Sequence, residues 1–408
     1  MSGCKSCFMA KLLQSLFVAL LFFSLLAACS KTSSVSTTGT TPAPDYSSSM
    51  SAGGGSGSSS NPGNGSTTQP GVITAGEWND IDNWSFWLGL MDTVQWKEKQ
   101  DYWKFYPQRI YTVELTAMNG TKINDATISF KNEGGNILWT AKTDNAGRAV
   151  SFPAIFGSAK GSVYSATALI SGRTIDLGIF PASQAITRKI DITVVPENNV
   201  DIMYVVDATG SMGDELNYLK NELNDVLLRS KNELPNMNLH VGSVFYRDQG
   251  DQYLTRVSPF TENIATLINF VKLQNADGGG DFPEAVHTAL STAIDQQSWS
   301  SNARTRLLFL VLDAPPHHED AVIQSIQVSV ERAAQKGIKI IPITASGIDK
   351  DTEFMMRFMS IATNGTYVFI TNDSGIGNSH LSPTVGKYDV EYLNNLMVRL
   401  IKKYSKAG

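Results

Sequence analysis

The stretch Ile202-Met203-Tyr204-Val205-Val206-Asp207-Ala208-Thr209-Gly210-Ser211 decides the fold of the C-terminal half of this chain. It opens with a short, fully apolar run of the kind that a parallel sheet buries on both faces. Similar runs follow at Leu239–Phe245, Leu307–Leu312, Ile338–Ile343 and Thr366–Ile370. Helical stretches separate them, at Asp214–Ser230, Thr261–Leu273, Pro283–Asp295, Ala321–Lys336, Thr352–Ala362 and Val390–Lys403. The alternation predicts an α/β fold with a doubly wound, mostly parallel sheet covered by helices on both sides.

Acidic segments lie where an open α/β sheet binds ligands, at the carboxyl ends of its strands or on adjacent connections. They are Asp207–Met212, Asp277–Glu284 and Asp313–His317. The first segment offers one carboxylate and two hydroxyl groups within a single turn. Oxygen ligands of this kind suit Mg²⁺, Mn²⁺ or Ca²⁺ rather than Zn²⁺.

The D-x-[ST]-x-S spacing of the first segment resembles the metal-ion-dependent adhesion site of the von Willebrand factor A family. The resemblance runs from about Asn198 to the C-terminus and includes, in the family's order, Tyr246-Arg247-Asp248 and the glycine-rich acidic loop. It implies that an ion, with Mg²⁺ expected and Mn²⁺ or Ca²⁺ as alternatives, is bound by Asp207, Thr209, Ser211 and Asp313. The family leaves one coordination position open, which a ligand carboxylate commonly fills. We therefore expect a protein ligand.

The second acidic segment departs from the best-known family members, because Asp281 stands where they have a threonine. As a metal ligand, Asp281 would bring three carboxylates to the ion and a local charge of about −1, which weakens attraction for an anionic partner. Alternatively, Asp281 caps the next helix, with Glu284 completing a capping box. We expect His317-His318 to lie on a loop surface and Arg247 to form a structural ion pair with Asp248.

The N-terminus has the pattern of a secretory signal, with Lys5 and Lys11 around a polar start and an apolar run at Leu12–Ala28. The run is shorter than the roughly 20 residues of a membrane-spanning helix. It ends in Leu26-Ala27-Ala28-Cys29, which resembles the lipobox of bacterial lipoproteins. The resemblance implies a signal peptide at residues 1–28 and a lipid on Cys29 that anchors the chain in the bacterial envelope. Ser30 follows the Cys at the position where an Asp would suggest retention in the inner membrane, so we expect the outer membrane.

Three further regions separate this lipobox from the α/β domain at residues 197–408. Residues 29–76 are rich in Ser and Gly and predict a disordered tether. Residues 77–107 are dense in aromatic residues, with a helix starting near Asp82 or Asn83; they form either a packing strap or a groove for sugars or peptides. Residues 108–196 are expected to form an all-β sandwich, since Asn124–Ala149 resembles the carboxypeptidase-regulatory-like fold, in which such modules are usually spacers.

The 408 residues carry a net charge of −5 and contain no run rich in Lys and Arg, which argues against nucleic acid as a partner. The expected function is a membrane-anchored, divalent-metal-dependent protein-binding or adhesion module. The alternatives are a scaffold for envelope assembly with a purely structural ion, and a metal-assisted hydrolase. A hydrolase would need a second metal centre, or a placed general base with a nucleophile. The sequence shows no such constellation, and His317 near Asp313 is the only candidate acid–base pair. We therefore expect no enzymatic activity.

Overall fold

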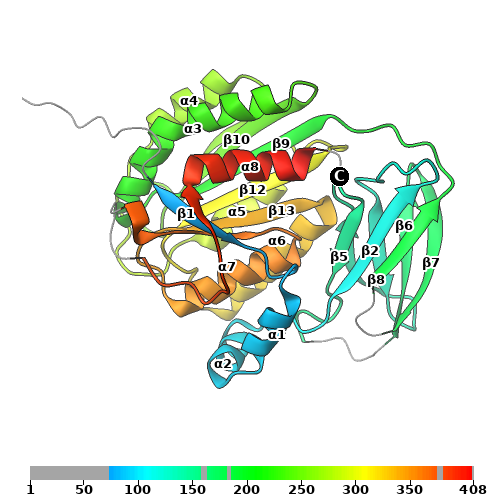
Figure 1. Cartoon of the computed structure of the whole chain (residues 1–408). Coiled ribbons are helices and arrows are strands. Elements are labelled where there is room, and N and C mark those ends of the chain that lie inside the picture. Colours follow the sequence, from blue (N-terminus) through cyan, green and yellow to red (C-terminus); the bar gives the residue numbers. More distant parts are fainter. Residues whose placement is uncertain (1–72, 158–162, 182–184, 375–379, 407–408) are drawn as a thin grey trace, which may run out of the picture. The chain divides into compact units, whose positions relative to one another are not determined.

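The computed structural model describes residues 73–157, 163–181, 185–374 and 380–406 (Figure 1). These residues belong to one compact unit, Gly65–Gly408. The predicted signal peptide, the predicted lipid attachment at Cys29 and the predicted tether up to residue 72 lie outside the described residues. Within the described ranges, every helix is too short or too polar to cross a membrane.

The largest β-sheet in the described part of the chain has eight strands, in the order β11-β10-β9-β12-β13-β14-β1-β15. The strands from β10 to β14 in this order run parallel, whereas β11, β1 and β15 each pair antiparallel with a neighbour. Their bounds are β1 Thr74–Trp78, β9 Asn199–Asp207, β10 Asn238–Tyr246, β11 Thr255–Thr261, β12 Thr305–Leu312, β13 Ile338–Thr344, β14 Tyr367–Ile370 and β15 Val390–Tyr392. This confirms the predicted α/β fold with a mostly parallel sheet.

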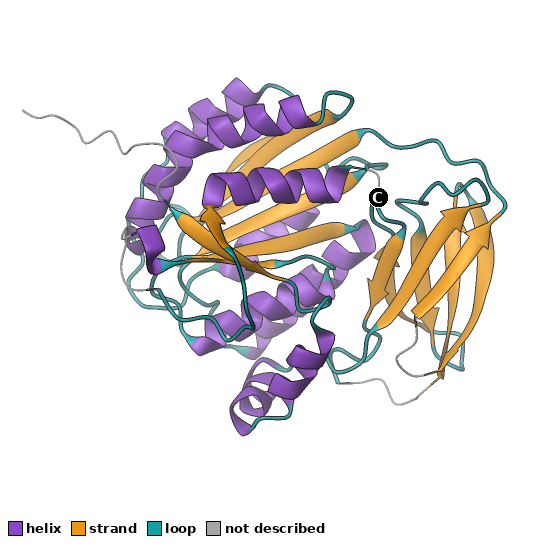
Figure 2. Cartoon of the chain, viewed as in Figure 1, coloured by secondary structure: helices purple, strands orange, loops and turns teal. Residues whose placement is uncertain are grey.

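Helices cover both faces of this sheet (Figure 2). Along β9, Ile202 and Tyr204 pack into one hydrophobic cluster while Met203 and Val205 pack into the other, as the twofold periodicity of a strand requires. The first cluster contains α3 (Gly213–Glu233), α4 (Ile264–Lys272) and α8 (Leu393–Ser405). The second contains α5 (Val286–Asp295), α6 (Asp320–Lys336) and α7 (Lys350–Ala362). Both faces of the parallel strands are therefore buried from solvent.

Strand β1 corrects the predicted extent of the tether, which was placed at residues 29–76. Ala75 is fully buried and pairs with Ile370 of β14 and Glu391 of β15, so the chain is already part of the sheet at Thr74. The partner strands lie about 300 residues away in the sequence, and a five-residue run containing Gly and Glu gives no local signal of its own. Strand β15 occupies the start of the segment Val390–Lys403, which is expected to be helical, whereas β11 shares only Thr261 with the expected helix Thr261–Leu273.

The aromatic segment forms two short helices, α1 (Trp84–Met91) and α2 (Val94–Trp103), which we call the strap. Trp87 stacks on Phe354 of α7 with 6.0 Å between ring centroids, and Trp84 lies 6.1 Å from Phe152 of the β-rich region. The fully buried Arg357 of α7 lies over the Trp87 ring. The strap therefore packs against both of the regions that follow it.

The β-rich region contains a three-stranded sheet, β5-β2-β8, and a four-stranded sheet, β4-β3-β6-β7. Tyr111 of the first sheet lies 5.7 Å from Phe130 and 5.2 Å from Tyr164 of the second, between ring centroids. Facing sheets joined by buried aromatic rings form the predicted sandwich. The strands are β2 Tyr111–Ala117, β3 Thr127–Lys131, β4 Ile137–Lys142, β5 Arg148–Ser151, β6 Val163–Ile170, β7 Arg173–Pro181 and β8 Ala185–Ile190.

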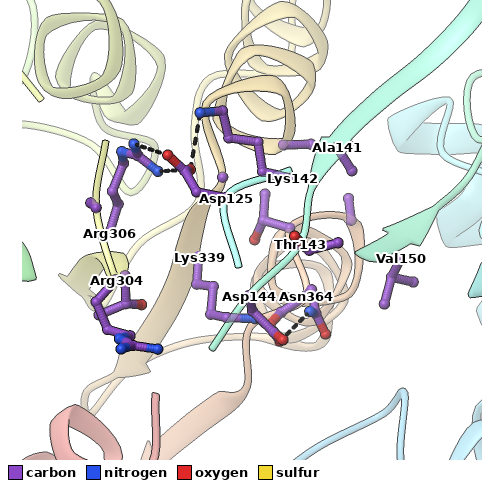
Figure 3. A pocket seen from close by; sticks show the side chains of 16 residues that line it. Asp125, Ala141, Lys142, Thr143, Asp144, Val150, Arg304, Arg306, Lys339 and Asn364 are labelled. Atoms are coloured by element: carbon purple, nitrogen blue, oxygen red, sulfur yellow. Dashed lines mark hydrogen bonds and ion pairs between the residues drawn. The ribbon is translucent and has the colours of Figure 1, made fainter. Parts of the chain in front are cut away.

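Ion pairs join the sandwich to the α/β domain (Figure 3). Asp125 accepts hydrogen bonds from Arg306 at 2.8 Å and 3.2 Å. Asp144, on the turn between β4 and β5, accepts from the buried Lys339 at 3.1 Å and from Asn364 at 3.0 Å. These buried, charge-assisted contacts hold the sandwich turns against the N-terminal ends of β12 and β13.

Candidate metal centre

The first acidic loop begins where β9 ends. Asp207 is fully buried, and its Oδ1 accepts hydrogen bonds from the Thr209 backbone N–H at 2.8 Å and from Thr209 Oγ1 at 2.7 Å. Its Oδ2 has no hydrogen-bond partner among the described residues. The Ser211 hydroxyl is 3.4 Å from Thr209 Oγ1, in the short 3-10 turn Gly210–Met212 that leads into α3. The predicted carboxylate and both predicted hydroxyls are therefore brought together.

A glycine loop closes over this turn. Gly210 N donates to Gly278 O at 3.0 Å, and Gly278 and Gly279 both have positive φ angles, +79° and +70°. A Cβ on Gly279 would lie 2.9 Å from Glu284 Oε1 and 3.1 Å from Thr209 Cβ. Glycine is required here because of both the backbone conformation and this close approach. The glycine loop thus brings Glu284 beside the first loop.

Asp313 follows β12 and contributes the second predicted carboxylate. It is 5% exposed and hydrogen-bonds with the Ser211 side chain, while its Oδ1 is buried without a partner in the described part of the chain. Burial raises the pKa of Asp313. Burial, and then the nearby Asp313 charge, raise the pKa of Asp207 to about 7. The Tyr246 hydroxyl is close enough to lower the pKa of Asp207 without making a hydrogen bond of good geometry.

The sequence predicts Glu284 only as a helix-capping residue, but the structure places it beside Thr209 and within the electrostatic influence of Asp207. It is 3% exposed, its N–H donates to Pro315 O at 2.9 Å, and its Oε2 has no partner within the described ranges. Burial, and then the charges of Asp207, Asp248 and Asp313, raise its pKa to about 9. A buried carboxyl without a hydrogen-bond partner, beside two others, points to a cation rather than to a cap.

The predicted roles of Asp281 are not borne out by its position. Asp281 is exposed, and it is not among the charges that raise the pKa of Asp207 or Glu284. Helix α5 begins at Val286 with Ala285 at its N-cap and no side-chain cap, so neither acid forms the proposed capping box. The glycine loop turns Glu284 inward and leaves Asp281 in solvent. The third carboxylate of the site is therefore Glu284.

The donor set fits a hard divalent cation. Three buried carboxylates and the hydroxyls of Thr209 and Ser211 supply only oxygen ligands, as Mg²⁺, Mn²⁺ or Ca²⁺ require. In the chain as described, no three His, Cys, Asp or Glu side chains converge closely enough to hold a metal by themselves. The hydroxyls would therefore have to complete the ligand set, as the D-x-T-x-S spacing predicts.

The neighbouring charged residues have partners other than those expected. Arg247 does not pair with Asp248; its guanidinium donates to Ala208 O at 3.1 Å and to Asn275 O at 2.8 Å. Asp248 instead pairs with His317 Nε2 at 2.7 Å. Arg247 thus links the first loop to the connection that precedes the glycine loop, and His317 is part of the loop network rather than free surface.

Comparison with known proteins finds similarity within the α/β domain. Residues 201–376 match the family model of the von Willebrand factor A domain. An ariadne-like RING finger protein of Acanthamoeba polyphaga mimivirus is 36% identical over 122 residues, which are 29% of this chain and 11% of the viral protein. The alpha-protein kinase vwkA of Dictyostelium discoideum is 25% identical over 171 residues, which are 41% of this chain and 27% of the kinase. This chain therefore spans only a small part of these relatives.

A solved structure, that of the conserved hypothetical protein BatB from Bacteroides thetaiotaomicron, is also similar. It matches 50% of this chain and 98% of its own length at 16% identity, with a TM-score of 0.34. The similarity to the von Willebrand factor A family model is confined to residues 201–376, within the α/β domain.

Proposed function

We propose that the von Willebrand factor A domain of this chain is a divalent-cation-dependent protein-binding module. The observation that carries the proposal is a cluster of buried carboxylate oxygens without hydrogen-bond partners: Asp207 Oδ2, Asp313 Oδ1 and Glu284 Oε2. Leaving one buried polar atom unsatisfied costs about 1–3 kcal/mol, and more when the group is charged. A bound cation would remove this penalty for the carboxylates that it contacts.

The ion would be held by Asp207, Ser211, Asp313 and Glu284, with Thr209 contributing its hydroxyl directly or through water. Its role would be to supply a positive charge at an exposed surface of the domain. Ser211 and the glycines of the neighbouring loop are exposed, so a partner can reach this side of the ion. Phe282 on the same loop is 44% exposed and offers apolar contact area next to the charge.

Three carboxylates give the loaded site a local charge of about −1. A site of this charge retains its ion well but attracts an anionic side chain less strongly than a neutral site does. We propose that the partner is bound through the loops around the ion, with a carboxylate as an optional rather than an obligatory contact. If the third carboxylate closes the ion to every outside ligand, the domain is instead a scaffold with a structural ion.

Calorimetric titration of Mg²⁺, Mn²⁺ and Ca²⁺ into the full-length chain, stripped of metal with a chelator, tests the proposal. Wild-type protein should bind one ion, and Glu284→Gln should weaken binding by at least tenfold. The matched control is Asp281→Asn on the same loop, which should bind as wild type does. Wild-type protein that binds none of the three ions would remove the basis of the proposal.

The proposed location is the bacterial outer membrane, with a lipid on Cys29 as the anchor. The sequence Leu26-Ala27-Ala28-Cys29, which resembles a lipobox, supports this proposed location. Metabolic labelling with a radioactive fatty acid should label the wild-type protein and not Cys29→Ser. A labelled Cys29→Ser variant would exclude Cys29 as the only lipid site.

A further inference from the structure

Two adjacent histidines in the loop that follows Asp313 contact different parts of the molecule. His317 Nε2 lies 2.7 Å from Asp248 Oδ1, within the network of loops around the site. The His318 ring stacks on Tyr102 of the strap, with 3.5 Å between centroids and 13° between planes. His318 Nε2 is also 2.8 Å from the Tyr102 carbonyl oxygen. One loop therefore joins the candidate metal centre to the strap.

The strap is a firmly held element. Trp96 of α2 lies 5.8 Å from Phe354 of α7, between ring centroids. Before the strap begins, Asp80 forms a fully buried ion pair with Arg357 of α7 at 2.6 Å. Beyond α2, Lys104 pairs with Asp320 at the first turn of α6 at 2.6 Å. The ring of His318 thus stacks against a part of the molecule that is packed on α7.

Asp248, the partner of His317, is in turn linked to the glycine loop through Asp251. Asp248 N donates to Asp251 Oδ2 at 3.1 Å, and Gly279 N donates to the same oxygen at 2.9 Å. Gly279 is the residue whose backbone lies against Thr209 and Glu284. A continuous series of contacts therefore runs from Tyr102 through the two histidines to the backbone that shapes the site.

We propose that Tyr102, His318 and His317 are positioning residues for the metal centre, and that the strap clamps the loop that carries Asp313. The proposal rests on the proposed metal-binding function. By this clamp, the strap limits where Asp313 and the glycine loop can lie, although no strap residue touches the ion. Ligand groups must be held within about 0.5 Å of their working geometry, and outer residues that orient them typically affect metal affinity by 10–100-fold.

The test is calorimetric titration of Mn²⁺ into full-length variants, beside their thermal unfolding. His318→Ala and His317→Ala should each weaken Mn²⁺ binding by about tenfold. His318→Phe keeps an aromatic ring on Tyr102, and His317→Gln keeps a donor for Asp248; both should restore most of the affinity. Since His318 is exposed, its replacement by Ala should change the midpoint of unfolding by no more than about 2 °C.

The matched control is Lys99→Ala, which removes the ion pair between the strap and Asp351 of α7 without touching the site loop. It should bind Mn²⁺ as wild type does. A Tyr102→Ala/His318→Ala double variant should lose no more affinity than either single variant, because both act through one contact. Additive losses, an equal loss in Lys99→Ala, or wild-type affinity in His318→Ala would each overturn the clamp. Wild-type protein that binds no Mn²⁺ would instead overturn the proposed function on which the clamp rests.

Discussion

Replacing Asp207 with Asn should stabilise the metal-free protein while abolishing metal binding. In the folded chain, burial and the Asp313 charge raise the pKa of Asp207 from 3.8 to about 7. The ionised form is therefore disfavoured by folding. Below about pH 4, Asp207 is protonated in both the folded and the unfolded chain, so its shifted pKa does not change stability. As the pH rises from about 4 to about 7, the unfolded chain loses this proton while the folded chain keeps it, so the free energy of unfolding falls.

The magnitude follows from the size of the shift. About three pKa units correspond to about 4 kcal/mol at a pH above 7. Asn cannot ionise; its Oδ1 can still accept from the Thr209 N–H, and its amide can donate to the neighbouring carboxylates of Asp313 and Glu284. A unit spanning residues 65–408 should gain about 6 °C in unfolding midpoint from 4 kcal/mol.

Thermal unfolding followed by circular dichroism at pH 8, in the presence of a chelator, measures this effect. Asp207→Asn should unfold at a higher temperature than wild type, and the difference should disappear near pH 4. Added Mg²⁺ should stabilise wild type and have no effect on the variant. Asp281→Asn, an exposed acid beside the same site, is the control and should match wild type throughout. An Asp207→Asn variant that unfolds at a lower temperature in chelator would refute the reasoning.

Mg²⁺ affinity should rise between pH 6 and pH 9, because Asp207 and Glu284, with pKa values of about 7 and about 9, must lose protons to bind the ion; titrations in buffers of different ionisation enthalpy measure the protons released. Glu284→Thr should weaken Mg²⁺ binding and make the remaining binding less dependent on pH above 7, as titrations across that range would show. Asp80→Asn should destabilise the chain by about 3–5 kcal/mol in denaturant unfolding, because the fully buried Arg357 loses its carboxylate; wild-type stability would show that Glu353 suffices.

Much of the α/β domain could be predicted from sequence because its central strands are buried on both faces. Ile338–Ile343 was predicted as a strand and β13 is Ile338–Thr344; Ala321–Lys336 was predicted as a helix and α6 is Asp320–Lys336. Strand β1 could not be found in this way, since Thr74–Trp78 is short, contains Glu77 and is held by strands from the other end of the chain. Local sequence does not carry such a pairing.

The candidate site was predicted in part for a similar reason. Asp207, Thr209 and Ser211 lie within five residues of one another, so a single turn brings them together. Which acid of the glycine loop turns inward depends on the path of that loop over Thr209, which only the tertiary structure shows. Local sequence does not separate the two acids, since Asp281 is followed by the apolar Phe282 and Glu284 by the apolar Ala285; the structure exposes Phe282 and buries Ala285.

An anomalous difference map from crystals of the protein grown with Mn²⁺ tests the proposed metal centre most directly. One strong peak should be enclosed by Asp207, Ser211, Asp313 and Glu284, with Asp281 outside the coordination sphere. A peak bound to Asp281 and not to Glu284, or an empty site at saturating Mn²⁺ with its three carboxyls hydrogen-bonded to one another or to water, would contradict it.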